Sequence, residues 1–217
     1  MQSLVCFALK EEAAAFRRIA AGKSDVKIVI VGIGQENATK SIRENLAGHS
    51  PTLVLTCGFA GGLDPDLKIG DVVFDIPAKN KSEPTYVGCC EKLTAAGAKP
   101  VKFFCADHIA TTVGEKTKLR QETGADAVEM ESAAIHAVCA EKNIPCVTVR
   151  VISDTAHEDL PLDFNLLAKP DKSMDFGKLA WAIARSPGKI GALMALQKKT
   201  GFAASRLAAV LGKIIPG

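Results

Sequence analysis

Short apolar segments alternate along the chain with segments that favour helices. Apolar, strand-like runs cover residues 4–9, 26–31, 52–55, 72–76, 101–105, 127–129 and 147–152. Helix-favouring segments cover residues 10–21, 37–47 and 132–142. Several of the strands are apolar on both faces, which is typical of a mostly parallel sheet covered by helices on each side. The sequence therefore predicts a three-layer α/β domain with a central, mixed, mostly parallel sheet.

A second pattern begins near residue 176. Residues 178–184, 189–198 and 202–215 mix basic and large apolar side chains in helix-like order, and the last acidic residue is Asp175. Residues 176–217 carry a charge of +7, so the net charge of +3 leaves −4 for residues 1–175. We therefore predict a domain over 1–175 and a basic, amphipathic helical extension over 176–217. The extension suits either an anionic membrane surface or a terminal helix that packs on the sheet with a solvated basic face.

Composition favours the cytoplasm and argues against metal chemistry. The seven cysteines include no CxxC pair and no cysteine–histidine cluster at zinc spacing, which predicts free thiols in a reducing compartment. No signal peptide is recognisable at the N-terminus, and no run of about 18 apolar residues predicts a membrane span. The four histidines do not pair at metal-ligand spacing. We predict neither a metal nor an organic cofactor.

Glycines and carboxylates follow the predicted strands, at the edge where open α/β sheets bind ligands. They are Glu11 and Glu12, a GIG at 32–34, GFAGG at 58–62, Glu129-Met130-Glu131 and Ser153-Asp154. Glycines let the backbone approach a ligand, and carboxylates supply acid, base and hydroxyl-binding chemistry. Each of these acids also has an alternative, purely structural interpretation. Glu12 would be an acid in the first turn of a helix, Glu129 and Glu131 an acid pair before a helix, and Asp154 an N-cap.

Five motifs occur together in one order: GIG at 32–34, GFAGGL at 58–63, GD at 70–71, VEMES at 128–132 and RVISD at 150–154. This set resembles the nucleoside phosphorylase/nucleosidase superfamily over roughly residues 1–165. Within it, the chain is most similar to methylthioadenosine/S-adenosylhomocysteine nucleosidases and to hopanoid-associated nucleosidases that remove adenine from adenosylhopane. The resemblance implies a phosphorylase/hydrolase-like fold, a small nucleoside substrate and a homodimer.

The resemblance also implies roles for individual residues. Glu12 would activate the attacking water, Asp154 would bind the purine edge and promote departure of the base, and Glu131 would hold the ribose 2′ and 3′ hydroxyls. Met130 would lie against the sugar. The remaining residues that we expect to bind substrate are Phe59, Ala60, Gly61, Ile109, Glu129 and Ser153.

The nucleophile distinguishes a hydrolase from a phosphorylase. Related phosphorylases place an arginine two residues before the glycine of the AGG-type motif, where this chain has Thr56. Arginine is the usual ligand for a phosphate dianion, so we predict that water is the nucleophile. A phosphate-dependent phosphorylase remains the alternative, as does a nucleoside-binding protein without activity. We do not expect nucleic-acid binding, because the basic tail has no pattern of stacking aromatic residues.

Two departures from the methylthioadenosine enzymes concern the substrate. Residues 79–97 are shorter than the region with which a neighbouring subunit covers the 5′ group in those enzymes. Ile109 stands where the family has a purine-stacking aromatic, and Phe59 stands where a small residue is usual. We predict that Phe59 supplies the stacking. An open 5′ side and a basic amphipathic tail fit a lipid-linked nucleoside such as adenosylhopane, with methylthioadenosine or S-adenosylhomocysteine as the alternative substrate.

Overall fold

One eight-stranded mixed sheet forms the middle of the computed structural model, which describes residues 2–48, 50–76, 83–167, 169 and 175–215. Four strands are parallel: β2 (Val26–Ile30), β1 (Ser3–Phe7), β3 (Leu53–Gly62) and β8 (Cys146–Asp154). Two further strands extend this order, β4 (Val72–Asp75), which is antiparallel to β8, and β5 (Lys99–Pro100). Parallel strands β6 (Phe103–Cys105) and β7 (Ala127–Glu129) branch from the end of β3.

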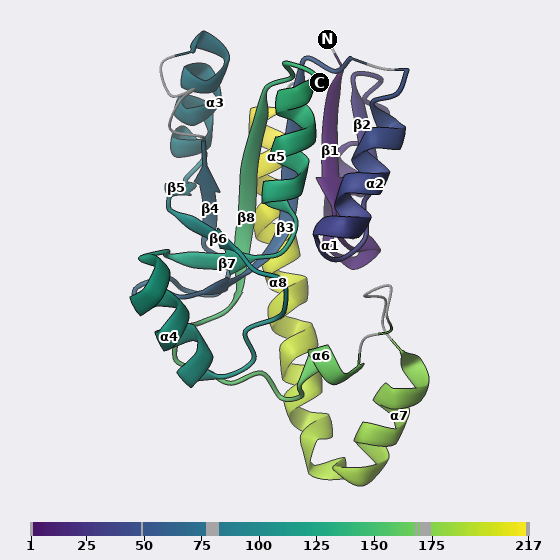
Figure 1. Ribbon diagram of the computed structural model, residues 1–217, viewed down its shortest axis with the longest axis vertical. Helices are drawn as coiled ribbons and strands as arrows, with labels where there is room; N and C mark the ends of the chain where they lie inside the picture. The colour runs from purple at the N-terminus through teal and green to yellow at the C-terminus, as the bar shows by residue number, and fades with distance from the viewer. Residues whose placement is uncertain (1, 49, 77–82, 168, 170–174, 216–217) are drawn as a thin grey trace.

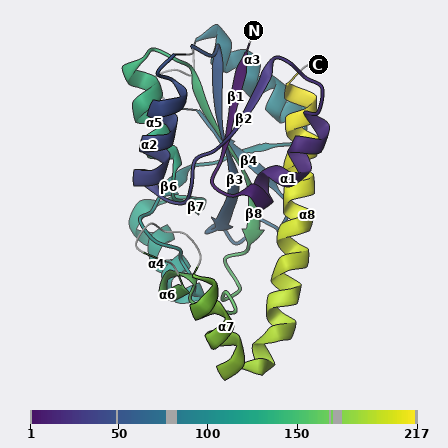
Figure 2. The same cartoon turned by 90° about the vertical axis from the view of Figure 1, so that its right-hand side faces the viewer.

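Helices cover both faces of the sheet, which confirms the predicted three layers (Figures 1 and 2). One face carries α2 (Gln35–Asn45) and α5 (Ser132–Glu141), and the other carries α1 (Lys10–Ile19), α3 (Pro84–Ala95) and α8 (Ile190–Ile214). Three more helices are α4 (Val113–Thr123), α6 (Phe164–Leu167) and α7 (Phe176–Arg185). In Figure 1, α6, α7 and the first half of α8 lie below the sheet.

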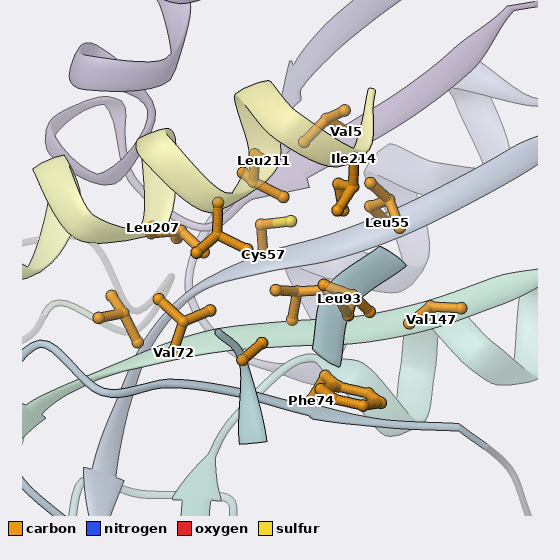
Figure 3. Close-up of a cluster of buried hydrophobic side chains, with 14 of the residues drawn as sticks. Val5, Leu55, Cys57, Val72, Phe74, Leu93, Val147, Leu207, Leu211 and Ile214 are labelled. Atoms are coloured by element: carbon orange, nitrogen blue, oxygen red, sulfur yellow. The ribbon is translucent and has the colours of Figure 1, made fainter. Parts of the chain in front are cut away.

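The larger core fills the space between the sheet and the face that carries α8. Val5, Leu55 and Val147 from three adjacent strands belong to the same buried cluster as Leu207 and Leu211 of α8 (Figure 3). A separate cluster lies under α2 and α5 on the opposite face. Burial of apolar area on both faces explains why most residues of β1, β3 and β8 are apolar.

The C-terminal helix packs on the sheet, which is the second of the two possibilities that the sequence left open. One continuous helix, α8 (Ile190–Ile214), spans almost all of the two predicted segments, 189–198 and 202–215, and it is joined to α7 through a short 3₁₀ turn over Pro187–Lys189. Its second half is buried against the sheet through Ala203, Ala204, Leu207, Ala208, Val210, Leu211 and Ile214. The core therefore does not end at residue 175, because the sheet face needs the second half of α8 to cover it. The segment 79–97 was expected to be a shortened cover over the 5′ side of the substrate. Residues 83–97 of it are described and contain α3, and residues 79–82 lie outside the described residues.

Candidate active site

A cavity of about 470 Å³ opens where the carboxyl ends of β1, β3, β7 and β8 meet. The ten residues predicted for the site all line it: Glu12, Phe59, Ala60, Gly61, Ile109, Glu129, Met130, Glu131, Ser153 and Asp154. Helix α8 contributes Leu196 and Thr200, and α6 contributes Phe164. These last contacts could not be predicted from the sequence, in which the basic tail resembles a separate unit.

Glu12 is buried, unlike the exposed Glu11 beside it. Its Oε2 accepts the backbone N–H of Leu9 at 2.9 Å, and its Oε1 accepts the N–H of Phe59 from β3 at 2.8 Å. Burial raises the pKa of Glu12, although nearby Arg150 and the backbone donors act in the opposite direction. A fixed carboxyl group with a raised pKa is suited to accept a proton from water near neutral pH.

Arg150 lies beneath the carboxylates and was not identified from the sequence. It emerges from β8, is 1% exposed, and donates through Nη2 to Glu129 Oε2 at 2.6 Å and to Glu131 Oε2 at 3.3 Å. Its Nη1 donates to the carbonyl of Cys57 at 2.9 Å. The guanidinium also lowers the pKa of Glu12. One buried cation therefore lowers the pKa of three buried carboxyl groups.

The pKa values of Glu129 and Glu131 are shifted in opposite directions, although both side chains face the same guanidinium. Burial would raise the pKa of Glu129, but Arg150 and the donors of Ser132 hold it below its usual value; Ser132 Oγ lies 2.5 Å from Glu129 Oε1. Burial and the neighbouring Glu129 raise the pKa of Glu131 to about 7, against the opposing effect of Arg150. Glu129 is thus a structural acid at the start of α5, and its contact with substrate stays a prediction.

Glu131 has lone pairs free for a ligand. Its Oε1 accepts the N–H of Gly34 at 2.9 Å, and its Oε2 accepts from Arg150. Each carboxylate oxygen has two lone pairs, so one remains on each oxygen. Two acceptors on one carboxylate match the two hydroxyl groups of a vicinal diol.

Gly58 allows Glu12 and Arg150 to approach the same strand. The GFAGG segment continues β3 to Gly62. At Gly58, φ is +148°, and an added Cβ would lie 2.6 Å from Arg150 Nη1 and 2.7 Å from Glu12 Oε1. The glycine is required both by its backbone conformation and by the side chains packed against it.

Asp154 is held by a lysine that the sequence analysis also missed. Asp154 Oδ2 lies 2.6 Å from Nζ of Lys116, which is fully buried on α4, and Oδ1 accepts the hydroxyl of Ser153 at 2.7 Å. The hydroxyl of Ser153 is also 3.3 Å from the carbonyl of Ala60. Asp154 is therefore part of a side-chain network at the end of β8, and it is not an N-cap, because the next helix, α6, begins only at Phe164.

The expected base-binding residues come from two parts of the chain and both line the cavity. Phe59 is half-buried on β3, and its stacking on a purine stays a prediction. Ile109 is fixed by Asn165, which accepts its N–H and donates to its carbonyl, both at 2.9 Å. His108 lines the cavity beside Asp107, whereas His136 is half-buried on α5, where its Nε2 lies 2.8 Å from the hydroxyl of Thr148.

No group of three or more histidine, cysteine, aspartate or glutamate side chains in the described part of the chain is arranged to hold a metal ion. Within the same residues, no helix has the length and apolarity needed to cross a membrane.

The raised pKa of Glu131 predicts a pH dependence of ligand binding. Below about pH 7 this carboxyl group takes up a proton and loses an acceptor for a diol. We expect the dissociation constant of a ribonucleoside to rise about tenfold for each pH unit below 7, whereas a 2′,3′-dideoxynucleoside should lack this dependence. Titration calorimetry between pH 5 and 8 measures both. Equal pH dependence for the two ligands would contradict the assignment of Glu131 to the diol.

Comparison with known proteins identifies a family profile and similar sequences. The profile of the phosphorylase superfamily matches residues 76–185. The 5'-methylthioadenosine/S-adenosylhomocysteine nucleosidase of Shewanella halifaxensis is 30% identical over 172 residues, which cover 67% of this chain and 74% of the relative. The enzyme of the same description from Actinobacillus succinogenes is 30% identical over 189 residues, covering 73% and 82%.

Solved structures agree with the fold. The nucleosidase of this class from Campylobacter jejuni superposes with a TM-score of 0.70 at 17% identity, over 99% of this chain and 98% of that chain. Futalosine hydrolase of Helicobacter pylori superposes with a TM-score of 0.65 at 19% identity, over 97% of each chain. These likenesses extend through the C-terminal helix, in agreement with the packing of α8 into the core.

Proposed function

Because the chain belongs to the phosphorylase superfamily and is an N-ribosyl hydrolase that acts on adenine nucleosides, we propose that its ten predicted cavity residues carry out this hydrolysis. The observation that carries the proposal is the convergence of Glu12, Glu131 and Asp154 on one cavity, although they are up to 142 positions apart in the sequence. In this proposal no metal or cofactor takes part.

The proposed reaction divides the work among the three acids. The bond between the ribose C1′ and the purine nitrogen breaks, and its electron pair passes to the base. Water adds at C1′ and gives a proton to Glu12, while Glu131 accepts hydrogen bonds from the ribose hydroxyls. Positive charge that develops on the sugar is stabilised by the surrounding carboxylates. Asp154 binds the edge of the departing purine and passes it the proton with which the base leaves as neutral adenine, and the proton taken up by Glu12 returns to solvent after the reaction. Met130 contacts the sugar.

The charge of the cavity favours water over phosphate. Thr56 stands where related phosphorylases have an arginine, and the hydroxyl of Thr56 accepts from Arg150 at 3.2 Å. The Nη atoms of Arg150 are directed to Glu129, Glu131 and the Cys57 carbonyl. A phosphate dianion would meet these carboxylates without a free guanidinium to pair with.

For the 5′ substituent, we propose a large apolar group of the adenosylhopane type. The support is apolar lining from segments beyond the strand ends: Leu160, Phe164 of α6 and Leu196 of α8. A substrate panel tests this choice, with adenosine, methylthioadenosine, S-adenosylhomocysteine, futalosine and a 5′-alkylated adenosine. We expect kcat/KM to be highest for the alkylated compound. A tenfold preference for methylthioadenosine or S-adenosylhomocysteine would refute this proposal and indicate the activity named for the sequence relatives. A tenfold preference for futalosine would also refute it and indicate the activity named for the structural neighbour.

We also propose that the outer hairpin, defined as α7, the turn over 187–189 and the first half of α8, contacts an anionic membrane. Its exposed apolar side chains are Trp181 (62% exposed), Ile190 and Met194 (56% exposed). Basic residues accompany them, and the guanidinium of Arg185 lies 4.3 Å from the centre of the Trp181 ring. Aromatic and basic side chains together suit the interface of an anionic bilayer.

That the protein forms a homodimer stays a prediction.

Point variants test the membrane contact, since truncation at residue 175 would remove the core half of α8. We expect Trp181→Ser combined with Met194→Ser to lower binding to phosphatidylglycerol-containing vesicles at least fivefold in a sedimentation assay, because both exposed apolar side chains are lost. Val87→Ser, at an exposed apolar residue of α3, is the matched control and should not change binding. Equal sedimentation of wild type and the double variant, or no sedimentation of wild type, would refute the contact.

A further inference from the structure

The wall that α8 adds to the cavity lies outside the part of that helix that is packed in the core. Leu196 and Thr200 line the cavity. In the described part of the chain, the buried residues of α8 begin only at Ala203. Figure 1 shows the first half of α8 below the sheet. The position of this wall therefore depends on the continuity of the helix and on contacts outside the core.

Lys199 makes such a contact. It lies next to Thr200, and its Nζ pairs with Oε2 of Glu158, in the segment that follows β8. The two side chains are 38% and 28% exposed, so salt can screen the pair. Burial would raise the pKa of Glu158, but Lys199 and the N–H of Thr155 hold it below its usual value. Glu158 is therefore a carboxylate near neutral pH and can pair with an ammonium group.

Glu158 is itself fixed to the end of β8. Its Oε1 accepts the N–H of Thr155 at 3.0 Å, and its backbone carbonyl accepts from Nζ of the buried Lys116 at 3.0 Å. The segment continues to Leu160, which lines the cavity and donates its N–H to the carbonyl of Thr111 at 2.8 Å. These bonds anchor the segment independently of α8, so the ion pair connects α8 to a fixed partner.

One carboxylate therefore links two walls of the cavity. Leu160 follows Glu158 by two residues, and Leu196 precedes Lys199 by about one helical turn. Both leucines belong to the apolar lining proposed for the 5′ substituent. Loss of the ion pair would leave both walls in place but remove the contact that fixes the distance between them. Such a change alters the fit of a 5′ chain more than the fit of the base and the ribose, which depends on side chains at the strand ends.

Resting on the proposed function, we propose that Glu158 and Lys199 are positioning residues that hold α8 against the segment after β8 and thereby set the preference for substrates with an apolar 5′ chain. Neither side chain lines the cavity, so both act through the walls that do. The pair takes no part in the cleavage of the bond.

The test compares Glu158→Gln and Lys199→Met with wild type, using adenosine and 5′-butylthioadenosine as substrates. Glutamine can still accept the N–H of Thr155, so this variant weakens the link to α8 and keeps the anchor at β8. We expect the ratio of kcat/KM for 5′-butylthioadenosine over adenosine to fall about three- to fivefold in each variant, mainly through a higher KM, which is the size of effect that a partly exposed ion pair can have. Lys198→Met, at the exposed lysine beside Lys199, removes the same charge and should leave the ratio unchanged.

A double variant separates one shared contact from two separate effects. Glu158→Gln combined with Lys199→Met should lower the ratio no further than either single variant, because each already breaks the same contact. A purely structural role would lower kcat/KM for both nucleosides by the same factor and leave the ratio in place. A ratio that is unchanged or higher in the single variants, or decreases that multiply fully in the double variant, would overturn the proposal.

Salt provides a measurement that needs no substitution. Raising potassium chloride from about 0.05 M to about 0.5 M screens a partly exposed ion pair, so the wild-type ratio should fall about twofold while the ratio of Lys199→Met stays constant. An equal response of the two proteins would contradict the role of the pair. If neither variant folds, the wild-type protein decides alone, and a ratio that does not fall with salt rejects the role.

Ligand binding separates this proposal from the proposed function. Titration calorimetry with 5′-butylthioadenosine is carried out in the Glu12→Gln background, in which turnover is expected to be slow. We expect Lys199→Met to raise the dissociation constant about three- to fivefold in that background, and Lys198→Met to leave it unchanged. If wild type releases adenine from neither nucleoside but Lys199→Met still weakens binding, the proposed function fails and the role of the pair stands. An unchanged dissociation constant in the folded variant rejects the role, whether or not adenine is released.

Discussion

Replacing Glu12 by Gln is expected to lower kcat for adenine release by about 10²–10⁴-fold, the range for loss of a general base. The glutamine amide keeps the size of the side chain and can still accept one of the two N–H groups that hold Glu12, from Leu9 or Phe59. It cannot take a proton from water. KM should change much less than kcat, because Glu12 is proposed to act on the nucleophile and not on the bound nucleoside.

Glu11→Gln provides the matched control for that experiment. Glu11 is the neighbouring acid in the first turn of α1 and is exposed, so its neutralisation should leave kcat within about twofold. Initial rates of adenine release measure both variants, with circular dichroism to confirm folding. If Glu12→Gln retained more than about a third of wild-type kcat, Glu12 would not be the base.

Replacing Arg150 by Met is expected to destabilise the fold by about 3–5 kcal/mol, the range for breaking a buried ion pair from one side. Methionine fills part of the space but leaves Glu129 and Glu131 without their cation. Both acids would then have pKa values higher than in wild type, because the guanidinium lowers each of them. Groups whose pKa is raised in the folded state favour folding at low pH and lose that contribution as pH rises, so the loss of stability should be larger at pH 8 than at pH 5.

Urea denaturation at the two pH values measures this effect. Arg43→Met is the matched control, since Arg43 pairs with Glu141 at 2.7 Å on the surface with a side chain that is 54% exposed. An exposed pair contributes at most about 1 kcal/mol, with little dependence on pH in this range. If Arg150→Met lost equal stability at pH 5 and pH 8, the three carboxyl groups would not depend on Arg150 for their ionisation.

The layers and the strand ends could be predicted from the sequence because both follow from local patterns. Apolar runs between helical segments predict strands buried on both faces, and parallel strands bring their carboxyl ends to one edge. Glu12 lies in the first turn of α1 after β1, Asp154 is the last residue of β8, and Glu131 follows the end of β7 by two residues. All three line one cavity because these strand ends meet there. The resemblance to nucleosidases assigned their roles, and the spacing alone left structural roles open.

The partners of these acids could not be predicted in the same way. Arg150 lies inside the apolar run of β8, and a charged residue within a buried strand is the one signal that the sequence offered for it. Lys116 occurs among polar residues on α4, where nothing distinguishes a buried lysine from the exposed Lys118. Both contacts depend on tertiary packing between elements distant in the chain.

The C-terminal helix shows how composition can mislead. Its basic residues suggested a unit apart from the domain, but Leu207 and Leu211 lie in the main core while Leu196 and Thr200 line the cavity. One helix thus covers the sheet, forms a wall of the site and continues into the outer hairpin. We therefore expect substitutions on α8 to affect both stability and substrate preference.

The chemical form in which the ribosyl group is released tests most directly whether the protein hydrolyses the N-glycosidic bond. Nuclear magnetic resonance can identify the sugar formed from adenosine, or from a 5′-alkylated adenosine, in phosphate-free buffer and in buffer with added phosphate. We predict adenine and the free sugar at the same rate in both buffers, with no sugar 1-phosphate. Adenine release that requires phosphate and yields the sugar 1-phosphate would contradict hydrolysis by water activated at Glu12.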